Sequence, residues 1–331
     1  MSWHPVIRRG ALLLLLYVVV LGLVACAIEG NPGSTPVAQQ EVSSNPHALP
    51  SATPTLDDPT STPAPKATLT PTLPPTPTAT IEPTATPSPT PWPYVVVIDP
   101  GHGGRDLGAR RFNDERRMEY HESTVTLEVG LLLRDELESR GFQVVMTREG
   151  DYEVAPELRD GGGAGAADFT LIESQARVDL ANAAGGDLLL SIHKNAFEYP
   201  DGRRGLDVGG IQTYYCADRS FGDDNHRFAV LVHRAVMEAF LDFGYEIQDR
   251  GVLQDTYLSA PNSPRRYLIL LGPESPRIVR PSQMPGVLSE PLFITHEVEG
   301  QMARDPEVLA RLAVAYADAI EAFFLGVDPR E

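Results

Sequence analysis

The sequence has very few cysteines, since Cys26 and Cys216 are the only two in 331 residues. Two cysteines cannot build a disulfide framework, and a cysteine-based zinc site needs more thiolates than remain once Cys26 is modified, as argued below. Any bound metal must therefore be held by His, Asp or Glu side chains. Cys216 follows a strand-like run, where a small buried apolar residue is the simplest interpretation.

Basic residues are also scarce. The chain has 27 Lys and Arg against 45 Asp and Glu, a formal net charge of −18 at pH 7, and only 2 tryptophans. No basic stripe alternates with aromatic residues, so nucleic acid is not an expected partner. The one long apolar run, Ala11 to Val24, would form a helix of roughly 21 Å, which is short for a hydrocarbon core of about 30 Å.

That apolar run resembles a secretory signal. Arg8 and Arg9 precede it, and the motif LVAC closes it at Cys26. The motif resembles the bacterial lipobox, in which the cysteine is lipidated and becomes the first mature residue. We expect residues 1–25 to be removed and Cys26 to anchor the protein at the outer face of a membrane. An ordinary signal peptide with an incidental cysteine is the alternative.

Residues 26–93 consist mainly of Pro, Thr, Ser and Ala, with almost no large apolar side chains. Such a segment cannot bury enough surface to offset its ordering entropy, so we predict a disordered linker. Proline keeps the chain extended at roughly 3 Å per residue, which gives a reach of more than about 100 Å from the membrane. Residues 94–331 are long enough for one α/β domain with a sizeable core.

Strands and helices alternate along these residues. Strands are predicted at 94–99, 143–147, 187–192, 210–215, 267–271 and 286–293, and helices at 122–140, 170–184, 225–243 and from Asp305 onward. The first strand is a continuous Val and Ile run, typical of a strand covered on both faces. This order predicts an α/β fold with an open, mostly parallel twisted sheet and helices on both faces. In such a fold the ligand crevice lies at the carboxyl ends of the strands.

The last helix carries clear signals at its start and along one side. Asp305 is a predicted N-cap and Pro306 the first helical residue. Apolar residues then recur at helical spacing and predict a buried stripe: Val308, Leu312, Tyr316, Ile320 and Phe323.

Two histidines follow two of the predicted strands. His102 comes after the first strand in DPGHGG, and His193 after the third in LLLSIHKNA. A single loop histidine is usually unremarkable, but two at equivalent ends of parallel strands should overhang one crevice. The glycines around His102 permit positive φ and remove side-chain bulk. They do not form a dinucleotide-binding fingerprint, because Asp106 stands at the third glycine position.

A carboxylate can complete a ligand set with the two imidazoles. Glu122 opens the first helix, where its charge also suits the positive helix terminus, and that structural role is the alternative. Two His and one Glu form a set that catalytic zinc prefers, with a fourth position left for water. His121 is the competing ligand, and spacing alone does not decide between the two.

Glu290 lies in the otherwise apolar segment PGVLSEPLF. A buried carboxylate is costly unless it has a partner or a task, so either a salt bridge, for example to Arg250, or a catalytic role is expected. Beside a metal-bound water, a carboxylate is a natural general base. Glu173 is assigned to a capping box that begins at Thr170, and is left out of the chemistry.

Four segments resemble, in order, the zinc-dependent N-acetylmuramoyl-L-alanine amidases of the type 3 family: VVVIDPGHGGRDLGA, ESTVTLEVGLLLRDELESRGFQVVMTR, ESQARVDLANAAGGDLLLSIHKNA and MPGVLSEPLFIT. The resemblance covers essentially all of residues 94–325. It implies a peptidoglycan hydrolase that uses a zinc-activated water to cut between the lactyl group of muramic acid and the first L-alanine of the stem peptide.

The resemblance also implies roles for single residues. It implies zinc ligands at His102, Glu122 and His193, which favours Glu122 over His121, and it makes Glu290 the catalytic glutamate. Two further residues, Asn195 and Arg177, are candidates for contacts behind the metal ligands or to substrate. A helix-surface or core-edge role for Arg177 remains equally open.

Some positions depart from the family pattern. The Gly/Ala-rich stretch 160–167 resembles an insertion, the segment LGPESPRIVRPSQ is longer than usual, Pro291 replaces an expected glycine, and Lys194 replaces a small residue. These departures leave the metal site intact and bear on substrate preference. Two rival functions stay open: a zinc peptidase that cuts within the stem peptide, and a non-catalytic wall-binding lipoprotein.

Overall fold

A six-stranded sheet forms the centre of the computed structural model, which describes residues 92–159, 165–258 and 267–328. Its strands are β1 (Val95–Pro100), β4 (Gln143–Met146), β5 (Leu188–Ile192), β6 (Ile211–Tyr215), β7 (Asp249–Gln254) and β8 (Gly286–Pro291). They lie in the order β4-β1-β5-β8-β6-β7. The first four in this order are parallel, whereas β6 is antiparallel to β8 and parallel to β7. The predicted mostly parallel sheet is therefore confirmed.

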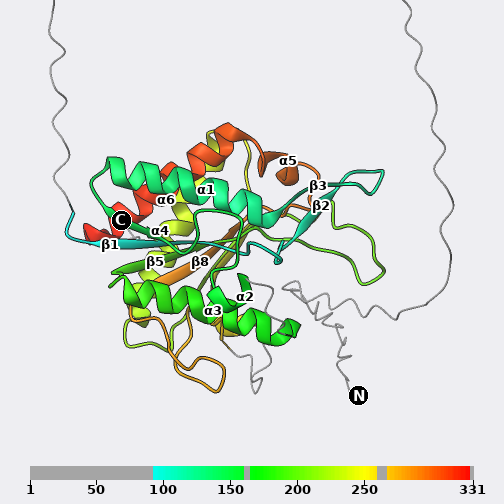
Figure 1. The fold of residues 1–331 in the computed structure, drawn as a ribbon. Helices are drawn as coiled ribbons and strands as arrows, with labels where there is room; N and C mark the ends of the chain where they lie inside the picture. Colours follow the sequence, from blue (N-terminus) through cyan, green and yellow to red (C-terminus); the bar gives the residue numbers. More distant parts are fainter. Residues whose placement is uncertain (1–91, 160–164, 259–266, 329–331) are drawn as a thin grey trace, which may run out of the picture. The chain divides into compact units, whose positions relative to one another are not determined.

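Helices cover both faces of the sheet (Figure 1). One face carries α1 (Glu122–Ser139), α4 (Gly222–Leu241) and α6 (Pro306–Phe324), and the other carries α2 (Pro156–Arg159) and α3 (Ala166–Ala183). The smaller elements are a hairpin of β2 (Arg110–Phe112) and β3 (Met118–His121), the 3-10 helix η1 (Asp255–Leu258) and α5 (Glu299–Met302). Across the described residues, no helix combines the length and apolar character that crossing a membrane requires.

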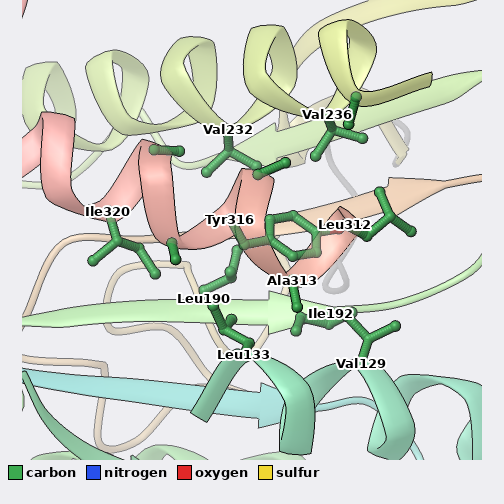
Figure 2. Close-up of a cluster of buried hydrophobic side chains, with 14 of the residues drawn as sticks. Val129, Leu133, Leu190, Ile192, Val232, Val236, Leu312, Ala313, Tyr316 and Ile320 are labelled. Carbon is green, nitrogen blue, oxygen red and sulfur yellow. The ribbon is translucent and has the colours of Figure 1, made fainter. Parts of the chain in front are cut away.

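The larger apolar core lies between the sheet and the helices α1, α4 and α6. The Asp305 side chain caps α6 by accepting the N–H of Glu307 at 2.9 Å, as the sequence predicts. The predicted stripe of α6 is buried. Figure 2 shows this stripe meeting Val232 and Val236 of α4 on one side and β5 and α1 on the other. Each fully buried side chain of this kind contributes about 1.5–3 kcal/mol, so this face supplies much of the stability.

Several predicted elements were wrong or missing. Residues 267–271 form turns rather than a strand, and their apolar side chains Leu270 and Leu271 instead enter a smaller core cluster on the α3 side. The strand beside β6, at one edge of the sheet, is instead β7, whose sequence DRGVLQ has little apolar character. The hairpin of β2 and β3 was not predicted. α3 begins at Ala166 rather than Thr170, with Gly165 at its N-cap.

The predictions for the amino-terminal part concern residues outside the described ones. Residues 1–91 lie outside them, and so do Cys26, the signal segment and almost all of the predicted linker. Those predictions stay untested. Cys216 is a buried free thiol, as expected.

Candidate metal centre

Three side chains that the sequence singled out meet at the carboxyl end of the sheet. His102 follows β1, His193 follows β5, and Glu122 opens α1. Since β1 and β5 are parallel neighbours, their ends bring the two imidazoles to one place. His102 Nε2 lies 3.1 Å from His193 Nδ1 and 3.1 Å from Glu122 Oε2, and His193 Nδ1 lies 3.0 Å from Glu122 Oε1. We call these three residues the ligand group.

The spacing of the ligand group suits one small divalent cation. Ligand atoms about 2.0–2.1 Å from a tetrahedral zinc lie roughly 3.3 Å from one another. One ligand atom from each residue of the group lies within 4.8 Å of the others. His102 Nδ1 lies 2.8 Å from Asp106 Oδ2, so a proton on Nδ1 leaves the Nε2 lone pair facing the other ligands. The ligand group can therefore hold a metal ion, and its donor set fits zinc.

Backbone amides fix the carboxylate of Glu122. The N–H of Ala109 donates to Oε2 at 2.9 Å, and the N–H of Lys194 donates to Oε1 at 2.8 Å. Burial alone would raise the pKa of Glu122, but the charge and hydrogen bonds of His102, together with those of His193, hold it well below its usual range. Glu122 is thus an ionised carboxylate in a site suited to positive charge.

Two glycines leave the space that the side chains of the ligand group need in order to lie close together. A Cβ at Gly101 would lie 2.4 Å from the His193 ring, and one at Gly108 would lie 2.6 Å from Glu122 Oε2. The sequence predicted that the glycines near His102 permit positive φ and remove side-chain bulk. Gly103 and Gly104 do adopt positive φ, +128° and +60°, and Gly101 provides the missing bulk. His102 itself adopts φ +62°, which was not predicted.

Glu290 lies next to the ligand group on β8. The N–H of His193 donates to Ser289 O at 2.9 Å, which places the following residue, Glu290, beside His193. The carboxylate is buried, and Asn195 Nδ2 donates to its Oε2 at 3.0 Å and to Gln212 Oε1 at 2.7 Å. Burial raises the pKa of Glu290 to about 8, with a further contribution from Glu122. Glu290 is therefore a buried, oriented carboxyl group.

The alternative salt bridge between Glu290 and Arg250 does not form. Arg250 Nε donates to Gly209 O, and its guanidinium lies 4.9 Å from the Phe293 ring centroid. Among the described residues, none of the ion pairs involves Glu290. In the part of the chain that the structure describes, a salt bridge therefore does not explain why the Glu290 side chain is buried.

Arg177 lies behind His102 and is buried. Its Nη1 donates to Asp99 Oδ1 and to Pro100 O, both at 2.8 Å, and its Nη2 donates to His102 O at 2.6 Å. A helix-surface position for Arg177 is therefore excluded. Its guanidinium supports the loop that carries a ligand and is too buried to face a substrate directly.

The capping-box assignment of Glu173 was wrong. Glu173 lies inside α3, and its carboxylate accepts the N–H groups of Val154 and Ala155 at 2.7 and 3.0 Å. It also pairs with Arg177 at 3.0 Å. The motif misled because the helix starts earlier, at Ala166, where Gly165 lacks a capping side chain. Glu173 thus belongs to the charged network behind the ligand group.

His121, the competing ligand, lies outside the ligand group. It is the N-cap residue of α1, and its Nδ1 lies 2.9 Å from Ser123 Oγ. The ring is therefore engaged on its own helix, one position before Glu122.

The sequence profile of N-acetylmuramoyl-L-alanine amidases matches residues 96–322, which include the ligand group and Glu290. The chain belongs to the N-acetylmuramoyl-L-alanine amidase family. The family prediction is thereby confirmed.

Two relatives show how far the similarity to this amidase family extends. The germination-specific N-acetylmuramoyl-L-alanine amidase of Bacillus subtilis is 39% identical over 102 residues, which are 31% of this chain and 39% of that protein. The endolysin of Bacillus phage SPP1 is 26% identical over 226 residues, 68% of this chain and 64% of the phage protein. The chain thus spans less than two thirds of either relative.

A solved structure has the same fold. The structure of the CwlD amidase from Clostridioides difficile in complex with the GerS lipoprotein is 23% identical, covers 71% of this chain and 100% of that chain, and has a TM-score of 0.52. At this identity the likeness concerns the fold alone, and it confirms the α/β prediction.

Sequence reasoning missed several residues of this amidase-family site. Asp106 was noted only for breaking a glycine fingerprint, yet it fixes the ring of His102. Gln212 orients Asn195 from β6, and a polar residue in a strand expected to be buried was the available signal. Arg148, two residues after β4, donates to Pro100 O and Gly101 O in the segment before His102.

Proposed function

We propose that this chain hydrolyses the amide bond between N-acetylmuramic acid and L-alanine in peptidoglycan, with zinc held by His102, Glu122 and His193. The observation that carries the proposal is the convergence of the ligand group with the buried carboxyl of Glu290 in a member of the amidase family. When bound, zinc supplies a water whose pKa is lowered from about 15.7 to about 7 and polarises the substrate carbonyl. A side-chain nucleophile is then unnecessary.

Glu290 holds and moves the proton in this proposal. Its carboxylate accepts a proton from the attacking water and passes it to the departing amine of L-alanine. Asn195 fixes Oε2 by a 3.0 Å hydrogen bond, which orients the carboxylate toward the ligand group. The raised pKa of Glu290 supports both roles, because an acid-base group works best when its pKa is near the working pH.

We further propose where the enzyme acts. Residues 1–25 would be a signal peptide, Cys26 the lipid-anchored first mature residue, and 26–93 a linker to the catalytic domain at 94–331. The anchor would hold the protein at the outer face of the membrane, and the linker would let the domain reach peptidoglycan. The sequence patterns described above support this arrangement.

Product analysis tests the proposed reaction. Purified peptidoglycan is digested with the full chain, with and without a chelator, and the muropeptides are identified by mass spectrometry. We expect a free L-alanine amine and an intact lactyl sugar, loss of both with chelator, and recovery with added zinc. Cuts within the stem peptide would instead identify a zinc peptidase, and tight wall binding without released peptide would identify a non-catalytic protein.

A further inference from the structure

Arg148, two residues after β4, is a fully buried cation whose hydrogen bonds go to neutral oxygens. Its side chain has no exposed surface. Nε donates to Pro100 O at 2.9 Å, and Nη1 donates to Gly150 O at 3.0 Å. In the described part of the chain, Arg148 takes part in none of the ion pairs. Burial lowers the pKa of Arg148 to about 10, and the neighbouring Arg177 adds to this.

Nη2 of Arg148 joins the two segments that carry metal ligands. It donates to Gly101 O at 2.8 Å and to Ser123 O at 2.7 Å. Gly101 directly precedes His102, and Ser123 directly follows Glu122. One planar nitrogen therefore sets the distance between the two ligand-bearing segments. Thr126 closes the arrangement, since its hydroxyl donates to Gly101 O at 2.8 Å and accepts from Nη2 at 3.1 Å.

A second set of hydrogen bonds connects Arg177 with the segment of β5 that precedes His193. Arg177 donates to His102 O and to Asp99 Oδ1, and the other oxygen of Asp99 accepts the Ser191 hydroxyl at 2.7 Å. Ser191 lies on β5, two residues before His193. This chain of contacts ties the end of β1 to the end of β5, so the positions of all three ligands are fixed.

The loop that receives these contacts is conformationally unfavourable. His102 has φ +62°, a left-handed conformation that residues other than glycine rarely adopt and that persists only when the surroundings enforce it. A buried cation without a carboxylate is also costly. Arg148 donates to Gly101 O, directly before the strained His102, so these two costly features in one loop point to a shared role.

We propose that Arg148 is a positioning residue that holds His102 and Glu122 at metal-binding distance before a metal binds, with Arg177 and Asp99 doing the same for His102 and His193. The inference rests on the proposed function, because it takes the ligand group to bind zinc. Arg148 touches neither substrate nor metal in this role. Its contribution is a preformed site.

Zinc affinity of Arg148→Met tests the proposal. We expect the dissociation constant, measured by chelator competition on the full chain, to rise about 10- to 100-fold, as for other residues that orient metal ligands. Electrostatics alone predicts the opposite sign, because removing a positive charge near a cation site strengthens cation binding. The visible spectrum of the cobalt-substituted variant should change as well, since it reports the ligand geometry.

Arg219→Met is the matched control. Arg219 lies beyond the end of β6 and also donates to backbone oxygens, those of Leu271, Gly272 and Ser282. Its loss should lower the melting temperature while zinc affinity stays at the wild-type value. Wild-type zinc affinity in Arg148→Met, with a similar loss of melting temperature, would show that Arg148 is merely structural and would overturn the proposal.

Three further outcomes are distinguished. If Arg148→Met does not fold, Thr126→Val carries the test, because it keeps the side-chain shape and removes one hydrogen bond to Gly101 O; zinc binding should weaken about 5-fold, and unchanged binding overturns the proposal. If the wild-type chain binds no zinc, the proposed metal centre fails along with this inference. If the wild type binds zinc and cuts peptidoglycan while the variants bind equally well, only the inference fails.

Discussion

The two faces of the central sheet bury different chemistry, although the same strands supply both. Toward α1, α4 and α6, β1 and β5 present Ile98 and Leu190, which both belong to the larger apolar cluster. Figure 2 shows Leu190 within this cluster. Toward α3, Val97 and Leu189 of the same strands belong to the smaller apolar cluster. At the carboxyl ends of the strands, however, this face presents the polar Asp99 and Ser191, and β8 adds Glu290. Because neighbouring residues on a strand point to opposite faces, one sheet separates these functions. The apolar face mainly stabilises the fold, and the α3 face holds the polar network around the ligand group.

The largest expected effect concerns the α3 face. Glu290→Gln should lower the rate of peptidoglycan hydrolysis by about 100- to 10,000-fold, since it removes the proposed proton carrier. Zinc content after dialysis should not change, because Glu290 is outside the ligand group. His193→Ala should lose both zinc and activity. A wild-type rate of hydrolysis in Glu290→Gln would show that Glu290 is not the proton carrier.

The apolar face should respond in stability rather than in chemistry. Leu133→Ala in α1 creates a cavity at a side chain with no exposed surface and should lower the free energy of unfolding by about 2–5 kcal/mol. Zinc affinity well below the melting temperature should be unchanged. Leu132→Ala is the control, because that side chain is 39% exposed and its loss should cost less than about 0.5 kcal/mol. A loss of zinc affinity in Leu133→Ala would show that the two faces are coupled.

The pH dependence of stability gives a third, smaller contrast. The pKa of Glu290 is raised from 4.5 to about 8, with burial as the main cause. The folded chain therefore binds this proton more tightly than the unfolded chain does. The contribution of this proton to the stability of the fold is fully present below the pKa that Glu290 has in the unfolded chain. It is lost as the pH rises through the pKa that Glu290 has in the folded chain.

Glu290→Gln cannot lose this proton, so it isolates the effect. In chelator, the melting temperature of Glu290→Gln relative to wild type should rise between about pH 5 and about pH 9. Added zinc should reduce the difference, because a nearby cation favours the carboxylate. If the melting temperatures of the two proteins instead change with pH in the same way across this range, Glu290 does not bind a proton in its buried state.

The features that sequence predicted are those with a local or topological cause. His102 and His193 could be placed together because both follow parallel strands, and the stripe of α6 could be read from helical spacing. The run 267–271 shows the limit of such patterns. Its apolar residues reflect burial in a core cluster, and burial alone does not distinguish a strand from a turn.

The features that sequence missed depend on contacts between distant segments. Arg148 recognises backbone oxygens of Gly101 and Ser123, and a backbone oxygen carries no residue identity that a pattern could reveal. Glu173 similarly accepts the amides of Val154 and Ala155, while its sequence matched a capping box. The two histidines could thus be placed together from sequence, and Glu122 was chosen over His121 only through the family resemblance, whereas the groups that hold these side chains in place required the fold.

The smallest expected effect lies at a polar contact within the apolar face. Tyr316 Oη donates to Ser289 Oγ at 3.1 Å, and both side chains are fully buried. Tyr316→Phe keeps the packed ring and removes the hydroxyl, so it should lower the free energy of unfolding by about 0.5–1.5 kcal/mol. Adding Ser289→Ala should recover part of that loss, because no unpaired hydroxyl would remain.

This contact tests the separation of the two faces most closely. Ser289 precedes Glu290 on β8, so the two side chains leave adjacent backbone positions toward opposite faces. If the faces act independently, denaturant unfolding will show a lower free energy of unfolding for Tyr316→Phe, while its zinc affinity and rate of hydrolysis stay at wild-type values. A marked loss of rate would mean that the hydroxyl of Tyr316 helps to set the position of Glu290 through one residue of β8, and the apolar face would then share in aligning the site.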